Sequence, residues 1–108
     1  MKAITVSIVR WVDDEPQPGI VECNLVDRFG KRWTFIEKSA VVSTATLDAN
    51  SSYPQAAMIG CRIVTTGLDD NGREFALVDT ELPRGIEADD GTTRFEVFTD
   101  QLQQTWVE

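Results

Sequence analysis

The sequence predicts an all-β protein: a small antiparallel barrel, closed or partly open, of about seven strands built from successive hairpins. Apolar residues alternate with polar or smaller ones in short segments along the chain. Turns rich in Asp, Gly and Pro separate these segments. The 108 residues, 42% of them apolar, suffice for one hydrophobic core and not for two. We therefore expect a single domain over residues 1–108, with at most one or two short helical turns.

Three strands are expected in the first part of the chain, near residues 3–12, 20–26 and 31–38. Each has apolar side chains at every second position, which is the pattern of a half-buried strand. The alternating residues are Ile4, Val6 and Ile8, then Val21, Cys23 and Leu25, then Trp33 and Phe35. The Pro- and Asp-rich residues 13–19 and the Asp-x-x-Gly residues 27–30 provide the intervening turns.

The second part of the chain begins with one long connection, residues 39–57, in which residues 44–49 are expected to hold at most a single helical turn. The remaining strands are expected near residues 58–66, 73–79, 84–88 and 93–98, with inward side chains at Ile59, Cys61, Ile63, Phe75, Leu77, Phe95 and Val97. A short helix capped by Thr99 or Asp100 is expected over residues 99–105. The aromatic residues outside the alternating pattern are Trp11, Phe29, Tyr53, Phe98 and Trp106. We expect two or three of them to close the barrel ends and the others to be exposed candidates for contacts.

Two of the predicted turns have the same residue pattern. Asp27 and Asp69 are each followed by a Gly three residues later, a basic residue four residues later and an aromatic residue six residues later. The Asp side chain can bond the turn backbone and the Gly can adopt a positive φ, so the pattern has a physical reason without duplication. The turn at residues 89–91 does not keep this spacing to Phe95.

The two cysteines, Cys23 and Cys61, lie in the apolar phase of two predicted strands. A reactive cysteine needs an exposed, electropositive site, and neither a histidine nor a Cys-x-x-Cys spacing is present. We expect both to be reduced thiols in the core. The N-terminal residues lack the apolar run of a signal peptide, and no segment approaches the roughly 18 to 20 apolar residues of a membrane span. The sequence therefore predicts a cytoplasmic protein without membrane contact.

Several classes of chemistry lack the residues that they need. The absence of histidine removes the commonest general base and the commonest zinc ligand. The acidic turns lack the spacing of an EF-hand loop, and Gly-x-Ser-x-Gly and phosphate-binding glycine loops are missing. We therefore expect no metal and no cofactor, and we rank an enzyme below a binding protein.

The charge distribution is the strongest functional signal in the sequence. The net charge is -8, which disfavours nucleic acid as a partner because phosphate binding relies on Lys and Arg. Residues 1–65 hold seven acids and seven bases, whereas residues 66–108 hold eleven acids and three bases. An acidic surface can serve solubility alone, or it can steer a basic protein partner toward the chain.

The function that we predict is a non-catalytic, acidic protein-binding domain, in its most concrete version an immunity-type or antitoxin-type inhibitor of a basic partner. The expected contact residues are Asp69, Asp70, Asp89 and Asp90, with the aromatic residues Tyr53 and Trp106. Two alternatives stay open. One is a small enzyme or ligand carrier that uses carboxylates in the barrel mouth, and the other is a structural homo-oligomeric domain that pairs through a strand edge.

Overall fold

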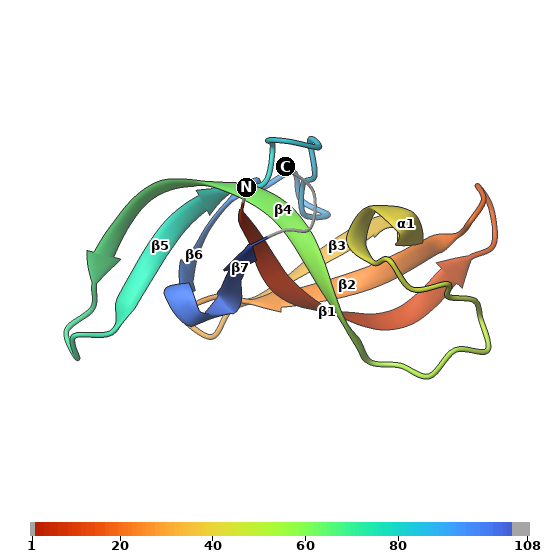
Figure 1. Cartoon of the computed structure of the whole chain (residues 1–108), viewed down its shortest axis with the longest axis horizontal. Helices are drawn as coiled ribbons and strands as arrows, with labels where there is room; N and C mark the ends of the chain where they lie inside the picture. Colours follow the sequence, from red (N-terminus) through yellow and green to blue (C-terminus); the bar gives the residue numbers. More distant parts are fainter. Residues whose placement is uncertain (1, 105–108) are drawn as a thin grey trace.

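The computed structural model describes residues 2–104 and confirms the all-β prediction, with antiparallel strands in one curled, half-open barrel sheet (Figure 1). The strands are β1 (Lys2–Asp13), β2 (Ile20–Val26), β3 (Arg32–Lys38), β4 (Gln55–Leu68), β5 (Glu74–Asp79), β6 (Arg94–Phe98) and β7 (Leu102–Gln104). Two short helical elements accompany them, α1 (Ser39–Val42) and the 3-10 turn η1 (Thr99–Gln101).

The sheet is organised around its two long strands, β1 and β4. The strand order is β3-β2-β1-β4-β5-β6, and β7 pairs with β1 beside this path. Residues 2–8 of β1 pair with residues 55–61 of β4, and the far half of β1 pairs with β2. The far half of β4, residues 62–68, pairs with β5. One half of the sheet is thus the meander β1-β2-β3, and the other half, which we call the arm, is β4-β5-β6.

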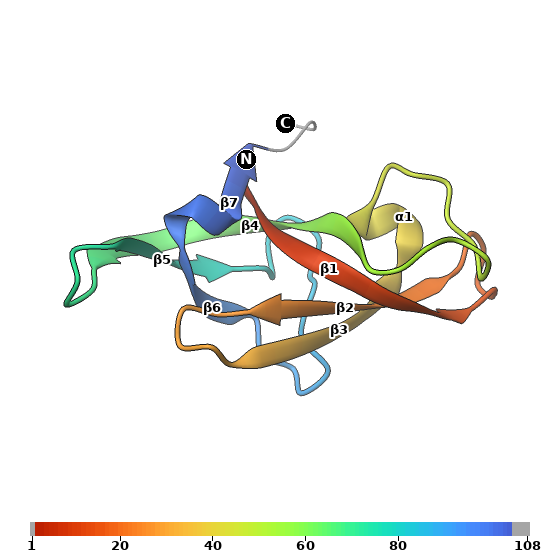
Figure 2. The same ribbon diagram turned by 90° about the horizontal axis from the view of Figure 1, so that it is seen from below.

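The two halves curl toward each other, so that β2 and β3 lie across the interior from β4 (Figure 2). Hydrogen bonds bridge the opening between the end strands. The Arg28 N–H donates to the Glu96 carbonyl at 2.9 Å, and the Asp89 N–H donates to the Thr34 carbonyl at 2.8 Å. The Phe95 ring packs edge-on against the ring of Trp33, 5.1 Å away between centroids. A turn and a loop therefore bridge the opening of the barrel. In a complete barrel, a continuous ladder of hydrogen bonds between the two end strands would close it.

The core consists of the side chains on the concave face of the sheet. Its fully buried residues include Ile4, Ile8, Val21, Cys23, Phe35, Ile59, Cys61, Ala76, Val78, Phe95 and Val97. Cys23 and Cys61 are unpaired and buried, as predicted. Burial, together with the charges of Glu37 and Glu22, raises the pKa of the Cys23 thiol to about 12, and burial raises that of Cys61 to about 11. Neither sulfur is available as a thiolate at neutral pH.

The prediction of a strand near residues 84–88 is wrong, because residues 80–93 form a loop. Ile86 and Ala88 are buried at alternating positions, which produces the period-two pattern without a ladder. Hydrogen bonds of Thr80 hold the loop in place, where a strand would be held by a ladder. Its carbonyl accepts from the Ile86 N–H at 3.1 Å, its hydroxyl donates to the Ile86 carbonyl at 2.6 Å, and its N–H donates to the Thr93 carbonyl.

Two further predictions about short elements are corrected. The helical turn expected over residues 44–49 lies at α1, directly after β3. The helix expected over residues 99–105 is the single turn η1 followed by β7, which pairs with Lys2–Ile4 of β1. Neither Thr99 nor Asp100 caps a helix: the Thr99 hydroxyl bonds the Glu74 carbonyl and Asp100 binds Arg73.

The inward phase predicted for β5 is also wrong. Phe75 and Leu77 are only half-buried, whereas Ala76 and Val78 are fully buried in the core. All four residues are apolar, so alternation in hydrophobicity could not distinguish the two faces. The larger side chains lie on the convex face of the arm.

Candidate protein-binding surface

Three turns of the protein are built in the same way. In the first turn, residues 27–31, the Asp27 N–H donates to the Lys31 carbonyl at 2.9 Å, and the Gly30 N–H donates to the Asp27 carbonyl at 3.0 Å. In the second turn, residues 69–73, the matching bonds measure 2.9 and 3.0 Å, and in the third, residues 88–92, they measure 2.8 and 2.9 Å. The glycines at the fourth position have φ values of 80°, 78° and 90°. Glycine is required there because other residues are strained at such φ values.

The sequence pattern does not reveal the third turn, because Ala88, Thr92 and Arg94 stand where the other two turns have an Asp, a basic residue and an aromatic residue. In the other two turns an Asp carboxylate at the first position accepts from two backbone N–H groups of the same turn. The carboxylate of Asp90 takes over part of this task, since it accepts from the Thr92 N–H at 3.0 Å. The same bond is the main reason that the pKa of Asp90 is lowered.

The four predicted acidic contact residues do not form one cluster. Asp69 and Asp70 lie in the second turn, directly before β5, whereas Asp89 and Asp90 lie in the loop that follows β5. The two pairs are therefore at opposite ends of that strand. The Asp89 N–H also ties its turn to β3. A partner that contacts both pairs must span the length of the arm.

The structure describes one of the two predicted aromatic contact residues, Tyr53. Tyr53 is half-buried against the core, and its hydroxyl donates to the Asp48 carbonyl at 2.8 Å. This bond organises the long connection between α1 and β4, so the ring has a clear structural role. Trp106 lies outside the described residues.

The convex face of the arm carries a set of residues that the sequence analysis did not single out. Directly opposite residues of antiparallel strands point to the same face, and the pairing here produces three rows across β4, β5 and β6. The rows are Gly67, Phe75 and Phe98; Thr65, Leu77 and Glu96; and Arg62, Asp79 and Arg94. Arg28 from the first turn and Arg73 from the second reach over the same rows. We call these residues, together with Phe29, the arginine face.

Two arginines on this face stack on aromatic rings. The guanidinium carbon of Arg28 lies 4.1 Å from the ring centroid of Phe29 and 3.8 Å from that of Phe75. The guanidinium of Arg73 lies 3.5 Å from the Phe98 centroid. Phe29 is 65% exposed, so one face of the stack is open to solvent. Guanidinium groups stack on ring faces because the ring quadrupole attracts the cation.

Carboxylates hold each of the four guanidiniums on the arginine face. Arg28 binds Glu96 at 3.0 Å and Arg73 binds Asp100 at 2.8 Å. Arg62 and Arg94 both approach Asp79, at 3.8 and 3.3 Å, and the Asp79 side chain is only 6% exposed. A hydrogen bond from the Glu81 N–H and the charge of Arg94 lower the pKa of Asp79 from its ordinary value of 3.8. Each guanidinium of the face is therefore paired with a carboxylate, in three separate groups.

The mostly buried carboxylate of this face, Asp79, is already engaged by ion pairs and a hydrogen bond. Asp79 is saturated by two guanidiniums and a backbone N–H, which leaves it ionised and occupied. A catalytic carboxylate pair needs two environments that separate the pKa values beside an open pocket. Among residues 2–104, no group of three or more His, Cys, Asp or Glu side chains could hold a metal ion.

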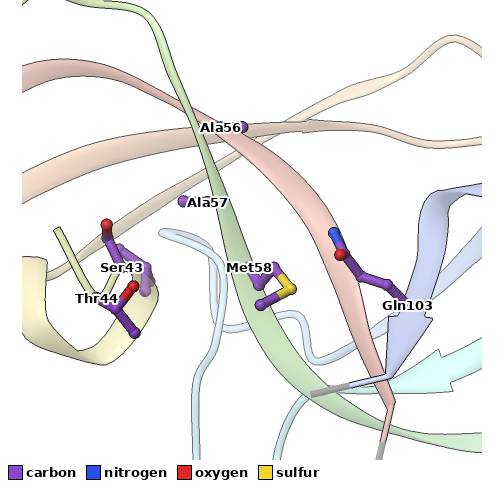
Figure 3. Close-up of a pocket in the computed structure, with 7 residues that line it drawn as sticks. Ser43, Thr44, Ala56, Ala57, Met58 and Gln103 are labelled. Atoms are coloured by element: carbon purple, nitrogen blue, oxygen red, sulfur yellow. The ribbon is translucent and has the colours of Figure 1, made fainter. Parts of the chain in front are cut away.

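A shallow pocket on another part of the molecule is lined by neutral side chains (Figure 3). Its volume is about 240 Å³, and its walls are Val42, Ser43, Thr44, Ala56, Ala57, Met58 and Gln103. The Ser43 hydroxyl accepts from the Ala45 N–H, and the Gln103 amide donates to the Thr5 hydroxyl. The lining thus offers no carboxylate to a substrate.

Comparison of the chain with known protein families, with curated proteins and with solved structures gives no match. Within the described part of the chain, no helix is long and apolar enough to cross a lipid bilayer. The class that the fold defines is a small, half-open antiparallel barrel whose convex arm carries an arginine-rich, aromatic surface.

Sequence reasoning missed the arginine face for identifiable reasons. Arg28 and Glu96 are 68 residues apart, so no local pattern links them. Phe75 was assigned to the core, where its neighbour Ala76 lies instead. One usable signal is the outward phase of β6, in which Arg94, Glu96 and Phe98 alternate with buried residues.

Proposed function

We propose that the protein is a non-catalytic binding domain for another protein, and that the partner contacts the arginine face. The observation that carries the proposal is the stack of Arg28 between an exposed Phe29 and a half-buried Phe75. Arginine and aromatic side chains are enriched among the residues that dominate binding energy at protein interfaces.

The ion pairs support this proposal because they order the face before binding. A free arginine loses rotamer entropy when a partner immobilises it, which weakens association. Here Glu96 already holds Arg28, and Asp79 lies between Arg62 and Arg94. These arginines therefore lose little further rotamer entropy when a partner binds.

The charge balance supports a basic partner. The four guanidiniums of the arginine face are nearly balanced by the carboxylates of Asp79, Glu96 and Asp100. The excess negative charge of residues 66–108 includes Asp69, Asp70, Asp89 and Asp90, which lie in the turns before and after β5. We propose that these flanking carboxylates steer a basic protein and that the aromatic centre holds it.

The narrower form of the proposal is an immunity-type or antitoxin-type inhibitor that covers a basic enzyme in the cytoplasm. Small size and a net charge of -8 support the inhibitor role. The two buried, unpaired thiols support a reducing compartment.

The test is quantitative capture from a lysate of the source cell, with the full chain immobilised at low salt. The Phe29→Ser variant should weaken a specific partner's binding at least about tenfold, while Leu82→Ser should retain it. Leu82 is a matched control because it is also an exposed apolar residue and lies outside the arginine face. Equal capture by wild type and Phe29→Ser would reject this surface as the contact.

The acidic flanks are tested separately once a partner is in hand. Converting Asp69, Asp70, Asp89 and Asp90 to their amides should slow association and flatten its salt dependence. An unchanged association rate would leave these carboxylates with a solubility role only.

A further inference from the structure

The second turn contains the one asparagine of the chain that is followed by a glycine. Asn71 and Gly72 are the third and fourth residues of this turn, and both are exposed. The turn projects from the tip of the arm (Figure 1). Among residues 2–104, no hydrogen bond engages the side-chain amide of Asn71. This amide is therefore free to turn toward the backbone that follows it.

An asparagine side chain can react with the backbone nitrogen of the next residue. The Gly72 nitrogen loses its proton to solvent and bonds to Cγ, the side-chain carbonyl carbon of Asn71. The bond from Cγ to the amide nitrogen breaks, and that nitrogen takes a proton from solvent and leaves as ammonia. Water then opens the succinimide ring, which leaves either an aspartate or an isoaspartate at position 71. Glycine favours the attack because it places no Cβ beside the nitrogen.

Residues 48–51 are arranged like the second turn around their own asparagine. The N–H of Asn50 donates to the carboxylate two residues before it at 2.8 Å, and the N–H of Asn71 makes the same bond at 2.9 Å. The N–H of the next residue donates to the carbonyl three residues before it, at 3.1 Å for Ser51 and at 3.0 Å for Gly72. Both asparagines are exposed. At the reacting bond, Ser51 carries a side chain beside the nitrogen and Gly72 carries none.

The first and third turns lack this chemistry at the equivalent position. Phe29 precedes the glycine of the first turn, and its side chain has no carbonyl group. Asp90 precedes the glycine of the third turn, and its carboxylate accepts from the Thr92 N–H at 3.0 Å, which lowers its pKa. An ionised carboxylate resists attack by a backbone nitrogen. Of the three turns, the second alone therefore presents a neutral amide before its glycine.

We propose that Asn71 is a site of spontaneous deamidation in the folded protein, through a succinimide formed with Gly72. The turn must open for this step, because the Gly72 N–H donates to the Asp69 carbonyl and has to leave that bond. The turn contacts β6 and η1 through the side chain of Arg73, whose ion pair is exposed. Opening can therefore be local and can leave the core intact.

Deamidation would change both the charge and the backbone of the second turn. Either product places a carboxylate next to Asp69 and Asp70, so that three acids follow one another. An isoaspartate also routes the main chain through the side-chain carbonyl and adds a carbon atom to it. The bond from the Gly72 N–H to the Asp69 carbonyl then loses its geometry. The inference does not depend on the arginine face being a binding surface.

Incubation of the full, folded chain in mildly alkaline buffer, followed by peptide mapping, is the test. Mass spectrometry detects the exchange of ammonia for water, and electron-transfer fragmentation distinguishes isoaspartate from aspartate. Asn71 should convert at least about tenfold faster than Asn50. Ser51→Gly should raise the rate at Asn50 at least about fivefold and leave the rate at Asn71 unchanged.

The chain unfolded in urea provides the reference rate at each asparagine. Asp69→Ala should speed the conversion of Asn71 in the folded chain and not that of Asn50, because the Asn71 N–H loses its acceptor. Equal rates at Asn71 and Asn50 in folded wild type would overturn the proposal. An Asn71 that shows no conversion in the folded chain after about ten half-times of its conversion in urea would overturn it too, because the turn would then protect it.

Discussion

The first and second turns have the same backbone and very different surroundings. In each, an Asp carboxylate accepts from two N–H groups, at 2.9 and 2.9 Å for Asp27 and at 2.9 and 2.8 Å for Asp69. Asp27 is 9% exposed and its second oxygen also accepts from the Trp33 indole N–H. The second turn projects from the tip of the arm (Figure 1).

The difference shows that the local sequence determines the backbone conformation of a turn. Contacts with distant residues determine whether the turn is packed into the fold. The first turn is docked on β6 through the Arg28 N–H and the Arg28 guanidinium, so it is part of what closes the barrel. Among the described residues, the second turn reaches β6 and η1 only through the Arg73 side chain, which stacks on Phe98 and forms an exposed ion pair with Asp100. The second turn is therefore less firmly attached to the rest of the fold than the first.

The largest expected difference in stability is between two single variants, one that removes the Asp27 carboxylate and one that removes the Asp69 carboxylate. Asp27→Ala should lower the free energy of unfolding by about 2 to 3 kcal/mol, because three N–H donors lose an acceptor in a largely buried site. Asp69→Ala should lower it by about 1 kcal/mol or less, since water can replace the carboxylate. Urea unfolding measures both. Asp27→Asn, which retains one acceptor oxygen, should fall between wild type and Asp27→Ala.

A smaller difference in the free energy of unfolding is expected between the variants Arg28→Ala and Arg73→Ala. Arg28→Ala should destabilise the protein by about 1 to 2 kcal/mol, because a mostly buried guanidinium loses both its carboxylate and two ring contacts. Arg73→Ala should cost about 1 kcal/mol or less, because its ion pair is exposed and its guanidinium stacks on one ring, Phe98, where Arg28 stacks on two. Equal losses in urea unfolding would contradict the distinction between a docked and a projecting turn.

The glycines should behave alike in the two turns. Gly30 and Gly72 have φ values of 80° and 78°, and a Cβ atom at either position would meet no other atom within 4 Å. Gly30→Ala and Gly72→Ala should therefore each cost about 1 kcal/mol, from backbone strain alone. A much larger loss at Gly30 in thermal or urea unfolding would mean that docking constrains the backbone itself.

The smallest effect concerns the ion pairs of Asp79 with Arg62 and Arg94, at the end of β5 away from the second turn. The pKa of Asp79 is lowered in the folded state, so its stabilisation is complete at neutral pH and is lost as pH falls through a folded-state pKa below 3.8. The stability gap between wild type and Asp79→Asn should therefore narrow from pH 7 to pH 3. A difference in urea midpoints that stays constant from pH 7 to pH 3 would contradict a lowered pKa of Asp79 in the folded state.

The sequence predicts those features that depend on neighbouring residues. The alternation at Ile4, Val6 and Ile8 correctly predicts β1, and the Asp-x-x-Gly pattern correctly predicts two turns. Cys23 is correctly placed in the core for the same reason.

Features that depend on contacts between distant residues could not be predicted in this way. The burial of Ile86 imitates a strand, but only the bonds to Thr80 reveal the loop. The stack of Arg28 on Phe75 joins the first turn to β5, and no local pattern relates these two segments. The arginine face is a product of the strand order, and it becomes visible only when β5 and β6 are placed beside the first turn.

Native-state hydrogen exchange tests the central claim most directly, because the two turns offer matched probes. The N–H groups of Phe29 and Lys31 bond Asp27, and those of Asn71 and Arg73 bond Asp69 in the same way. At concentrations that keep the chain monomeric, the first pair should exchange with an opening free energy close to that of global unfolding. The second pair should exchange through local opening that requires at least about 2 kcal/mol less. Equal protection of both pairs would contradict the account, because the second turn would then belong to the cooperative fold as fully as the first.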